Sequence, residues 1–307
     1  MTTYAEYRVQ FADAASGDVT TLAPTHLDLE LASVCNFRCP MCPQAETRVD
    51  WVKGFMPTAL ALRLLDEAKA IGVLSVKLNW RGESTLHPDC APIASHAKHL
   101  GFVDVMLNTN GAYDDAELSR ALCSHVDTLI FSIDSLDAAR AARLRPPGKL
   151  RQVLANLDAA LSAKAISGTP RSVRINFTRQ AENWDELPVM EAFCQQRGVE
   201  LYVKPVFPRN PPRVGFYYPE EKFMVQGRKN CGFPFQRLVV AHDGRVAPCC
   251  VPWTDTLYVG NVNNESLNSI WQSPALRMIR HDAKSAAYRH PTCVNCTSWA
   301  SYQVEHV

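Results

Sequence analysis

The residues with the clearest chemical potential in this 307-residue sequence are its eleven cysteines. They include a group of three in "CNFRCPMC" and a group of five in the last quarter of the chain: Cys35, Cys39 and Cys42, then Cys231, Cys249, Cys250, Cys293 and Cys296. The N-terminus does not resemble a secretion signal, so we expect a cytoplasmic protein. Thiols in a reducing compartment bind metals or take part in catalysis more often than they form disulfides.

The first cysteine group has the spacing C-x3-C-x2-C and directly follows the first predicted strand. Parallel α/β folds place their active sites at this end of the strands. Three thiolates are one short of the set for a tetrahedral zinc ion or a four-cysteine iron–sulfur cluster. A three-cysteine cluster would therefore leave one iron open to bind a substrate-like ligand. A zinc site with a distant fourth ligand and unligated thiols are the alternatives.

The second cysteine group has one thiol more than a closed cluster needs. Cys231, Cys293, Cys296 and one of the adjacent pair in "APCCVPW" would supply four thiolates, and a zinc ribbon with the same ligands is the alternative. Adjacent residues on an extended segment point to opposite faces, so Cys249 and Cys250 should have different roles. A shift of one residue in strand register would exchange these roles.

Short apolar strands alternate with helical patterns from about residue 27 to 206. This alternation predicts β/α units with a parallel sheet, and six units form an open, partial (β/α)6 barrel rather than a closed eight-stranded one. Cys90, Cys123 and Cys194 fall in the helices and are expected to be buried as small apolar side chains. The predicted strands are 26–33, 73–80, 102–109, 126–134, 172–178 and 199–206, and the predicted helices are 58–71, 90–100, 114–124, 150–166 and 184–197.

The composition of the sequence changes on either side of this segment. We expect an N-terminal extension over 1–26, the partial barrel over 27–206, a proline-rich linker or substrate-facing loop over 207–230, and a small cysteine-rich domain over 231–307. The last domain contains a predicted hairpin across the Asp-Gly pair of "VVAHDGRVAP" and a short helix near 266–280. Because so small a domain has little core, bound metal would supply much of its stability.

The composition also argues against a nucleic-acid or membrane partner. The formal net charge is +1, the apolar fraction is 47%, and no basic run or RNA-binding pattern is present. No apolar stretch approaches the ~20 residues of a membrane-spanning helix. We therefore expect a soluble protein with no nucleic-acid partner and no membrane.

The motif "CNFRCPMC" resembles the cluster-binding motif of radical S-adenosylmethionine enzymes, and Phe37 fits its aromatic position. The resemblance implies that its three cysteines bind a 4Fe–4S cluster whose open iron chelates the amino and carboxylate groups of S-adenosylmethionine. Arg81 departs from the family, which has glycine there, but backbone carbonyls make the contact in that segment. The resemblance continues strand by strand and implies cofactor-lining roles for Gly82 and Glu83 in "NWRGES", Asn108 and Asn110 in "NTNG", Ser132 and Asp134 in "SID", and Arg174 in "RINF".

The second cysteine group resembles the twitch domain, a shortened SPASM domain that carries one auxiliary 4Fe–4S cluster. The resemblance implies two clusters in all, with Cys231, Cys293 and Cys296 as auxiliary ligands. The family's pattern of glycine, four residues and cysteine matches Gly244 to Cys249, which favours Cys249 as the fourth ligand. A reductant such as flavodoxin or ferredoxin is the implied protein partner.

A free thiol beside a radical site has a definite use. The S–H bond is weaker than a C–H bond, so a thiol returns hydrogen to a substrate carbon radical, and return from the opposite face inverts the carbon. The thiol must stay protonated, which favours an apolar setting without an adjacent cation. The spare cysteine therefore suggests similarity to radical epimerases of aminoglycoside antibiotic biosynthesis, with Cys249 or Cys250 as the hydrogen donor.

Three alternatives stay open. A radical dehydrogenase that oxidises a carbinol of an aminocyclitol or aminosugar would need no thiol donor. A peptide-modifying maturase would be expected to carry more auxiliary cysteines, and a structural or electron-transfer protein would have no substrate. A polycationic aminoglycoside would need carboxylates at the mouth of the cleft, and the candidates, which could equally be solubilising charge, are Glu220, Glu221, Asp255 and Glu265.

Overall fold

The computed structural model describes residues 2–18, 21–42, 44, 52–205, 231–251, 257–294 and 296. The chain divides into two compact units, and each unit draws on distant parts of the sequence. The first unit contains Met1–Val34, Asp50–Met106 and Arg228–Cys296, and the second unit contains Cys35–Val49, Leu107–Gly227 and Thr297–Val307. The linear domain boundaries expected from the sequence stay predictions.

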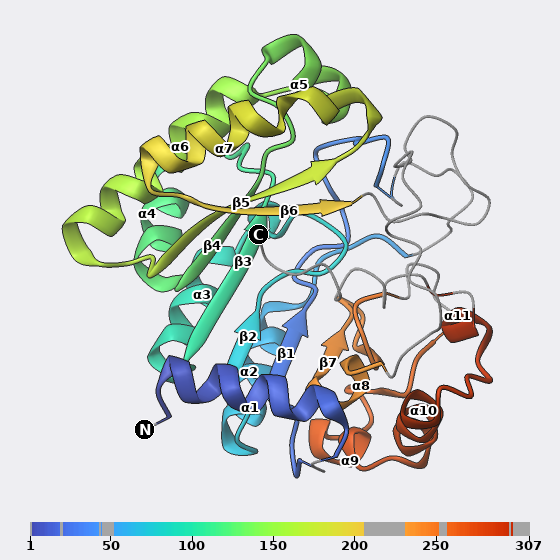
Figure 1. The fold of residues 1–307 in the computed structure, drawn as a ribbon. Helices are drawn as coiled ribbons and strands as arrows, with labels where there is room; N and C mark the ends of the chain where they lie inside the picture. The colour runs from blue at the N-terminus through green and yellow to red at the C-terminus, as the bar shows by residue number, and fades with distance from the viewer. Residues whose placement is uncertain are drawn as a thin grey trace. The chain divides into compact units, whose positions relative to one another are not determined.

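The sheet of the first unit is built around β1 (His26–Leu29), in which all four residues are buried. β1 pairs in parallel with β2 (Ser75–Lys77) on one side and with β7 (Arg237–Val240) on the other. Figure 1 shows β1, β2 and β7 side by side. The segment that begins near residue 231 therefore extends the sheet that begins at residue 26.

The predicted hairpin joins β7 to β8 (Arg245–Ala247) and is confirmed by the antiparallel pairing of Val240 with Val246. Gly244 in the turn has a φ of 92°, a left-handed conformation that residues with a Cβ rarely adopt. This conformation explains the Asp-Gly pair at the turn. The short strand β9 (Gly260–Asn261) then pairs with β8 in antiparallel direction.

Three helices of the first unit precede β3: α1 (Tyr4–Ser16), α2 (Thr58–Ala70) and α3 (Cys90–His99). The sequence predicts α2 and α3 but not α1. The N-terminal extension forms α1 because Thr3 and Glu6 cap it reciprocally, each side chain accepting a hydrogen bond from the other's backbone N–H. Among the residues of α1 only Tyr7 and Ala14 are buried, so its sequence shows no clear apolar stripe from which a helix could be predicted.

The helix predicted near 266–280 is two helices, α9 (Leu267–Trp271) and α10 (Pro274–Ser285). The Ser273 side chain accepts a hydrogen bond from the N–H of Leu276, which starts the second helix. Pro274 occupies its first turn, where a missing N–H costs no intrahelical hydrogen bond. Two single-turn helices, α8 (Phe233–Gln236) and α11 (Pro291–Val294), complete this part of the first unit.

The second unit contains the parallel strands β4 (Thr128–Ser132), β5 (Ser172–Arg179) and β6 (Glu200–Pro205). β3 (Asp104–Thr109) begins in the first unit and ends in the second. The predicted helices are present as α4 (Ala116–His125), α6 (Leu150–Ser167) and α7 (Leu187–Arg197). In Figure 1, α4 and α6 lie beside the strands of this unit, and α6 contacts both β4 and β5.

Two helical segments of the second unit are not predicted as separate elements, although the second overlaps the start of the helix predicted over 184–197. They are α5 (Ala138–Leu144) and the 3-10 helix η3 (Ala181–Glu186). The α5 sequence "AARAARL" is short and has Leu144 as its one large apolar side chain, so its hydrophobic pattern is weak. Among the described residues, a short 3-10 helix, η2 (Ser84–Leu86), also follows β2.

Parallel strands that alternate with helices confirm the predicted α/β class with a parallel sheet. Cys90, Cys123 and Cys194 are buried in helices, as expected, and burial raises the pKa of Cys90 to about 12 and that of Cys194 to about 11. Within the described ranges, the search for a helix both long and apolar enough to cross a membrane finds none.

Candidate active site

Hydrogen-bond donors of the second unit surround Cys35, the first cysteine of "CNFRCPMC". The N–H of Phe37 donates to Cys35 Sγ at 3.4 Å, and Asn110 Nδ2 donates to the same sulfur at 3.9 Å. Asn110 also donates to Asn36 Oδ1 at 2.6 Å, which fixes the amide. Donors directed at a sulfur favour its thiolate, which is the form that binds metal. Phe37 and Asn110, both predicted to line the cofactor, therefore contact a predicted cluster ligand.

Cys39 is buried beside an arginine that the sequence analysis did not single out. Arg145 Nη1 lies 4.0 Å from Cys39 Sγ, and Arg145 Nε donates to Asp134 Oδ2 at 2.6 Å. Burial raises the pKa of Cys39 to about 11, while the positive charge of Arg145 lowers it. The loop continues with a hydrogen bond from the N–H of Cys42 to the Cys39 oxygen at 2.9 Å.

A cavity of the second unit is lined by residues from three of the predicted segments. Phe37 comes from the cysteine loop, Asn110 follows β3, and Ser132 and Asp134 end and follow β4. Arg145 also lines this cavity. The segments meet because the carboxyl ends of parallel strands lie at the same edge of a sheet. The structure thus brings together four of the eight predicted cofactor-lining residues beside two of the predicted cluster ligands.

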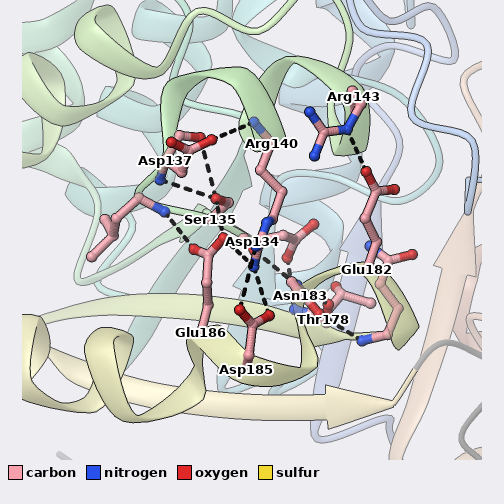
Figure 2. Close-up of polar contacts among 12 residues, drawn as sticks. Asp134, Ser135, Asp137, Arg140, Arg143, Thr178, Glu182, Asn183, Asp185 and Glu186 are labelled. Atoms are coloured by element: carbon pink, nitrogen blue, oxygen red, sulfur yellow. Dashed lines mark hydrogen bonds and ion pairs between the residues drawn. The ribbon is translucent and has the colours of Figure 1, made fainter.

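Asp134 is held in one orientation by three neighbours. One is Arg145, and the second is the N–H of Thr178, which donates to Asp134 Oδ1 at 2.6 Å. The third is Asn183 Nδ2, which donates to the Asp134 backbone oxygen at 2.7 Å. Figure 2 shows Thr178 and Asn183 converging on Asp134 from β5 and η3. Because the carboxylate is fixed, the guanidinium of Arg145 is fixed with it.

Ion pairs join α5, which ends beside Arg145, to η3. Arg140 Nη1 lies 2.7 Å from Asp185 Oδ1 and 2.8 Å from Glu186 Oε1, and Arg143 Nε lies 2.6 Å from Glu182 Oε1. Figure 2 shows both arginines of α5 directed at carboxylates of η3. Arg143 and Glu182 are exposed, so this second pair stabilises the contact only slightly.

Glu186 is the buried member of this contact. Its carboxylate accepts hydrogen bonds from Ser135 Oγ at 2.7 Å and from the N–H of Leu136 at 3.0 Å. These two residues directly follow Asp134. The charge of Glu186 thus fixes the turn that leads from β4 and the predicted "SID" segment into α5.

Two predicted lining residues of the second unit lie elsewhere. Arg174 Nη2 pairs with Glu200 Oε2 at 3.0 Å, where β6 begins. Asn108 lies on β3, and the cavity residues identified within the described chain include neither Asn108 nor Arg174. A cofactor role for these two residues stays a prediction.

Asn176, in the middle of "RINF", has a setting that suits a ligand better than that of Arg174. It is buried and lies opposite Ser132 in the register of β4 and β5. Its side-chain oxygen accepts no hydrogen bond from the part of the chain that the structure describes. A buried acceptor without a protein partner is unfavourable unless a ligand satisfies it. Asn176 is therefore a further candidate for contact with the cofactor.

The predicted segment "NWRGES" belongs to the first unit and packs against the end of β1. A Cβ at Gly82 would collide with the backbone oxygens of Ala32 and Val34, so only glycine fits there. The N–H of Glu83 donates to the Val34 oxygen at 2.9 Å. The segment is therefore fastened to the residue that directly precedes Cys35.

Cys249 shares its surroundings with two predicted auxiliary ligands. Its pKa lies well above the ordinary value, first because of burial and then because of electrostatic interaction with the neighbouring cysteines Cys250, Cys231 and Cys296. Cys296 also donates its N–H to the oxygen of Cys293 at 3.2 Å, so these two predicted ligands are joined through the backbone. The four thiols assigned to the auxiliary cluster thus belong to one region of the first unit.

Cys250 faces a different set of groups. Burial raises its pKa, Arg237 lowers it, Asp28 raises it and Lys77 lowers it. The expectation of a setting without cations is therefore wrong, but burial and one carboxylate outweigh the two cations and keep the thiol protonated. Its side chain packs against an apolar cluster formed by Trp80, Val239, Ala241 and Ala247.

The charged groups near Cys250 meet at the buried carboxylate of Asp28. Arg237 Nη1 lies 3.3 Å from Asp28 Oδ2, Lys77 Nζ lies 4.0 Å from Oδ1, and His26 Nε2 lies 3.6 Å from Oδ1. Burial lowers the pKa of His26, although Asp28 raises it. His26 Nδ1 also lies 2.6 Å from Ser75 Oγ. The imidazole is therefore neutral in the folded protein at neutral pH.

The polar groups around the first two cysteines suit a bound metal centre of negative charge. Among the described residues, no three His, Cys, Asp or Glu side chains converge on the position of one ion. A 4Fe–4S cluster takes one thiolate at each iron, so its ligands surround the cluster instead of converging. The donors at Cys35 and the cation at Cys39 suit an anionic cluster.

Two regions of the sequence match known protein families. Residues 29–174 match the radical SAM superfamily, in which SAM is S-adenosylmethionine, and residues 231–297 match SPASM, an iron–sulfur cluster-binding domain. The chain carries a radical SAM domain followed by a SPASM domain. It is therefore catalytic, and the broad resemblance inferred from the two cysteine groups is confirmed.

Relatives of this radical SAM enzyme have varied names. A "Tungsten-containing aldehyde ferredoxin oxidoreductase cofactor-modifying protein" of Pyrococcus furiosus is 26% identical over 319 residues, which cover 89% of this chain and 87% of that protein. A GTP 3',8-cyclase of a Synechococcus species is 31% identical over 189 residues, which cover 57% of this chain and 53% of the cyclase. The matched part thus spans about half the length of the cyclase.

Solved structures share the fold at low sequence identity. SuiB of Streptococcus suis bound to S-adenosylmethionine has a TM-score of 0.69 at 17% identity, over 96% of this chain and 75% of SuiB. BtrN in complex with AdoMet and 2-DOIA has a TM-score of 0.57 at 16% identity, over 87% of this chain and 89% of BtrN. At these identities the likeness concerns the fold alone.

Sequence reasoning missed Arg145 and Asn176. Arg145 follows an alanine-rich helix and precedes two prolines, a pattern that indicates only a helix end. No local signal connects it to Cys39, 106 positions earlier. Asn176 could have been found, because strand alternation places it on the same face as the predicted Arg174.

Of the four acidic residues proposed for the mouth of the cleft, Glu265 is the one that lies within the described residues. It is exposed before α9, and its Oε1 accepts a hydrogen bond from the N–H of Asn261 at 3.1 Å. Glu220, Glu221 and Asp255 lie outside the described residues. A substrate contact for any of the four stays a prediction.

Proposed function

We propose that this radical SAM enzyme is an epimerase that inverts one ring carbon of an aminoglycoside, of the type that converts neomycin C to neomycin B. The fifth cysteine of the second group, one more than a closed cluster needs, is the feature that suggests similarity to neomycin C epimerase. The observation that carries the proposal is the separate surroundings of the two adjacent cysteines. Cys249 shares its surroundings with Cys231 and Cys296, whereas the groups that act on Cys250 are Arg237, Asp28 and Lys77.

Two groups of residues would hold the cofactors. When bound, the first cluster and S-adenosylmethionine supply a 5′-deoxyadenosyl radical, which removes a hydrogen atom from an unactivated carbon. Phe37 and Asn110 would stabilise the thiolate of Cys35 through their N–H groups. Arg145 would do the same for Cys39. The proposed ligands are Cys35, Cys39 and Cys42 for the first cluster, and Cys231, Cys249, Cys293 and Cys296 for the auxiliary cluster.

Cys250 would supply the second hydrogen atom. Its S–H bond breaks while a C–H bond forms on the face opposite the one that lost hydrogen, so the carbon is inverted. This step leaves a thiyl radical on Cys250. One electron from a low-potential reductant such as flavodoxin or ferredoxin, and one proton from solvent, restore the thiol. The thiol begins the cycle protonated because burial raises its pKa.

The test is anaerobic incubation of the reconstituted enzyme with neomycin C, S-adenosylmethionine and dithionite in deuterated water. The expected product has one deuterium at the inverted carbon, and one 5′-deoxyadenosine forms for each molecule inverted. Mass spectrometry and NMR measure both. A ketone without deuterium would instead establish the dehydrogenase. No 5′-deoxyadenosine above background with neomycin C or a panel of related aminoglycosides would overturn the proposed substrate class.

Single substitutions assign the two cysteines. Cys250→Ala should still form 5′-deoxyadenosine but no inverted product, because the hydrogen donor is gone. Cys249→Ala should lose the iron of the auxiliary cluster, measured as iron and sulfide per chain. Cys123→Ala, which removes a buried thiol of α4, is the matched control and should change neither quantity. Inversion with deuterium in Cys250→Ala would contradict the donor assignment.

A further inference from the structure

The indole of Trp80 joins the predicted cofactor segment to the cysteine pair. Trp80 lies within "NWRGES", directly before Arg81 and Gly82. Its Nε1–H donates to the backbone oxygen of Cys250 at 2.9 Å. The same ring belongs to the apolar cluster against which the Cys250 side chain packs. Trp80 therefore binds the backbone of Cys250 and also belongs to the cluster against which the Cys250 side chain packs.

The ring of Trp80 is itself held by Arg81. The guanidinium carbon of Arg81 lies 4.0 Å from the centroid of the Trp80 ring, which is a stacking distance. Arg81 Nε donates to Glu30 Oε1 at 2.7 Å, and its Nη2 donates to Glu30 Oε2 at 2.8 Å. Both charged side chains are fully buried. A paired, planar guanidinium has little freedom, so the ring stacked on it has little freedom too.

The same carboxylate also reaches the turn after β7. Glu30 Oε2 lies 3.2 Å from both the backbone nitrogen and Nδ1 of His242. The hairpin that follows His242 leads directly to the cysteine pair. A continuous set of contacts thus connects the ends of β1, β2 and β7 to Cys250. Arg81 occupies the position where the family has glycine. These contacts therefore depend on a residue that differs from the family pattern.

We infer that Trp80 is a positioning residue that fixes the direction of the Cys250 thiol, with Arg81 and Glu30 as its anchor. The inference rests on the proposed function, in which that thiol returns hydrogen to the substrate. The indole N–H fixes the carbonyl of Cys250, and the ring limits the rotation of the side chain. Hydrogen return from the correct face depends on both. Trp80 therefore determines how often a hydrogen abstraction ends in inversion, and it takes no part in the abstraction.

The decisive variant is Trp80→Phe, which keeps an aromatic ring for Cys250 and Arg81 but removes the N–H donor. The ratio of deuterium-labelled, inverted neomycin to 5′-deoxyadenosine should fall by about fivefold, the effect of one lost hydrogen bond. The rate of 5′-deoxyadenosine formation should stay within about twofold of wild type, because a single hydrogen bond remote from the abstraction is lost. A fall in the rate with an unchanged ratio would contradict the inference.

Trp271→Phe is a closely matched control in the same unit. Trp271 is buried, its Nε1 donates to the Thr21 oxygen at 2.9 Å, and Arg280 lies 3.8 Å from its ring centroid. This variant loses the same kind of bond from the same kind of stack, away from the cysteine pair. It should leave the labelling ratio at the wild-type value. An equal fall in both variants would show a general loss of stability and would overturn the inference.

A second measurement does not depend on turnover. The rate at which iodoacetamide alkylates Cys250 in the reconstituted enzyme, followed by peptide mass spectrometry, reports how freely the thiol moves. It should rise about fivefold in Trp80→Phe and stay unchanged in Trp271→Phe. Arg81→Lys, which keeps the charge beside Glu30 but loses the planar stack, should raise it by a smaller factor. Equal alkylation rates in all four proteins would overturn the inference.

Cys250→Ala, measured in parallel, separates the two proposals. If it keeps labelled inversion, the proposed donor is wrong whatever Trp80 does. If it loses inversion while Trp80→Phe keeps both the wild-type ratio and the wild-type alkylation rate, the positioning role alone is wrong.

Discussion

The region around the cluster loop and the region around the cysteine pair each contain an arginine paired with a buried carboxylate, but the two pairs are held differently. In the second unit, Arg145 and Asp134 are supported by α5, whose pairs to η3 include the exposed Arg143 and Glu182. In the first unit, Arg81 and Glu30 are both 0% exposed. The first pair depends in part on exposed ion pairs, which salt weakens. The second pair is fully buried and is screened little by salt.

This difference suggests a division of tasks. The cofactor cavity needs an arginine of fixed position at the end of a short helix, and exposed ion pairs can hold that helix at little cost. The cysteine pair needs the Cys250 thiol to be held away from Cys249. The buried pair of Arg81 and Glu30 can support this position at any ionic strength, because salt screens buried charges little. The comparison predicts that equal substitutions in the two regions have unequal effects.

The largest effect is expected from Glu30→Leu. It leaves the buried Arg81 without its carboxylate and should lower the free energy of unfolding by about 3–5 kcal/mol. The control is Glu182→Leu, the same substitution in the exposed pair with Arg143, which should cost about 0–1 kcal/mol. Urea unfolding of both variants measures the contrast. Similar costs would remove the distinction between the two regions.

The next effect is expected from Arg145→Met, which leaves the carboxylate of Asp134 buried and unpaired. It should cost about 3 kcal/mol of stability, because Arg145 is partly reached by solvent. It should also reduce 5′-deoxyadenosine formation at least about tenfold, since one cation beside Cys39 is lost. Arg143→Met, two positions earlier on the same helix, should keep both quantities near wild type. Full activity in Arg145→Met would show that the cavity does not need this charge.

A smaller effect is expected from Asn183→Ala. Its side chain donates to the oxygens of Asp134 and Thr178 and accepts from the N–H of Gln180, and all three bonds are buried. Their loss should cost about 2–3 kcal/mol. Asn263→Ala removes an exposed amide that donates to the Asp243 oxygen and should cost about 0.5–1 kcal/mol. The midpoints of thermal unfolding should shift in the same order.

The smallest effect concerns pH and belongs to the first unit alone. Burial lowers the pKa of His26, so below the ordinary value of about 6.5 the unfolded chain binds a proton that the folded chain does not. Stability should therefore fall with decreasing pH, by at most about 1.4 kcal/mol per pH unit from this group. His26→Gln should show a flatter profile between pH 7 and 5.5 in urea unfolding. A slope equal to that of wild type would place the responsible group elsewhere.

Periodicity and spacing were sufficient to predict the six strands of the β/α segment, the hairpin of β7 and β8, and most helices, but not β9. They failed where few residues of a helix are buried, as in α1, or where the helix is short and has one large apolar side chain, as in α5. They also could not predict which distant segments pair. The parallel contact of β1 with β7 joins residues more than 200 positions apart, and no local pattern encodes it.

The site shows the same limit at the level of single residues. The family resemblance implied cofactor contacts for Phe37 and Asn110, and both residues donate hydrogen bonds to Cys35 Sγ, while their contact with the cofactor stays a prediction. It did not indicate Arg145, because no local pattern connects this arginine to Cys39, which lies 106 positions earlier in the sequence. For the adjacent cysteines, the sequence left two assignments open, and only the groups around each thiol distinguish them.

The parallel contact between β1 and β7 has a consequence for how this protein can be divided. A chain that ends at residue 230 would lose not only the cysteines after that point but also the strand that covers one edge of β1. The exposed edge would present unpaired N–H and C=O groups next to buried apolar residues, and such edges associate with one another. We therefore expect the N-terminal part, expressed alone, to aggregate instead of forming a smaller active enzyme. β1 needs the SPASM region, because β7 of that region covers one of its edges. We therefore expect that the SPASM region cannot be removed as an independent module.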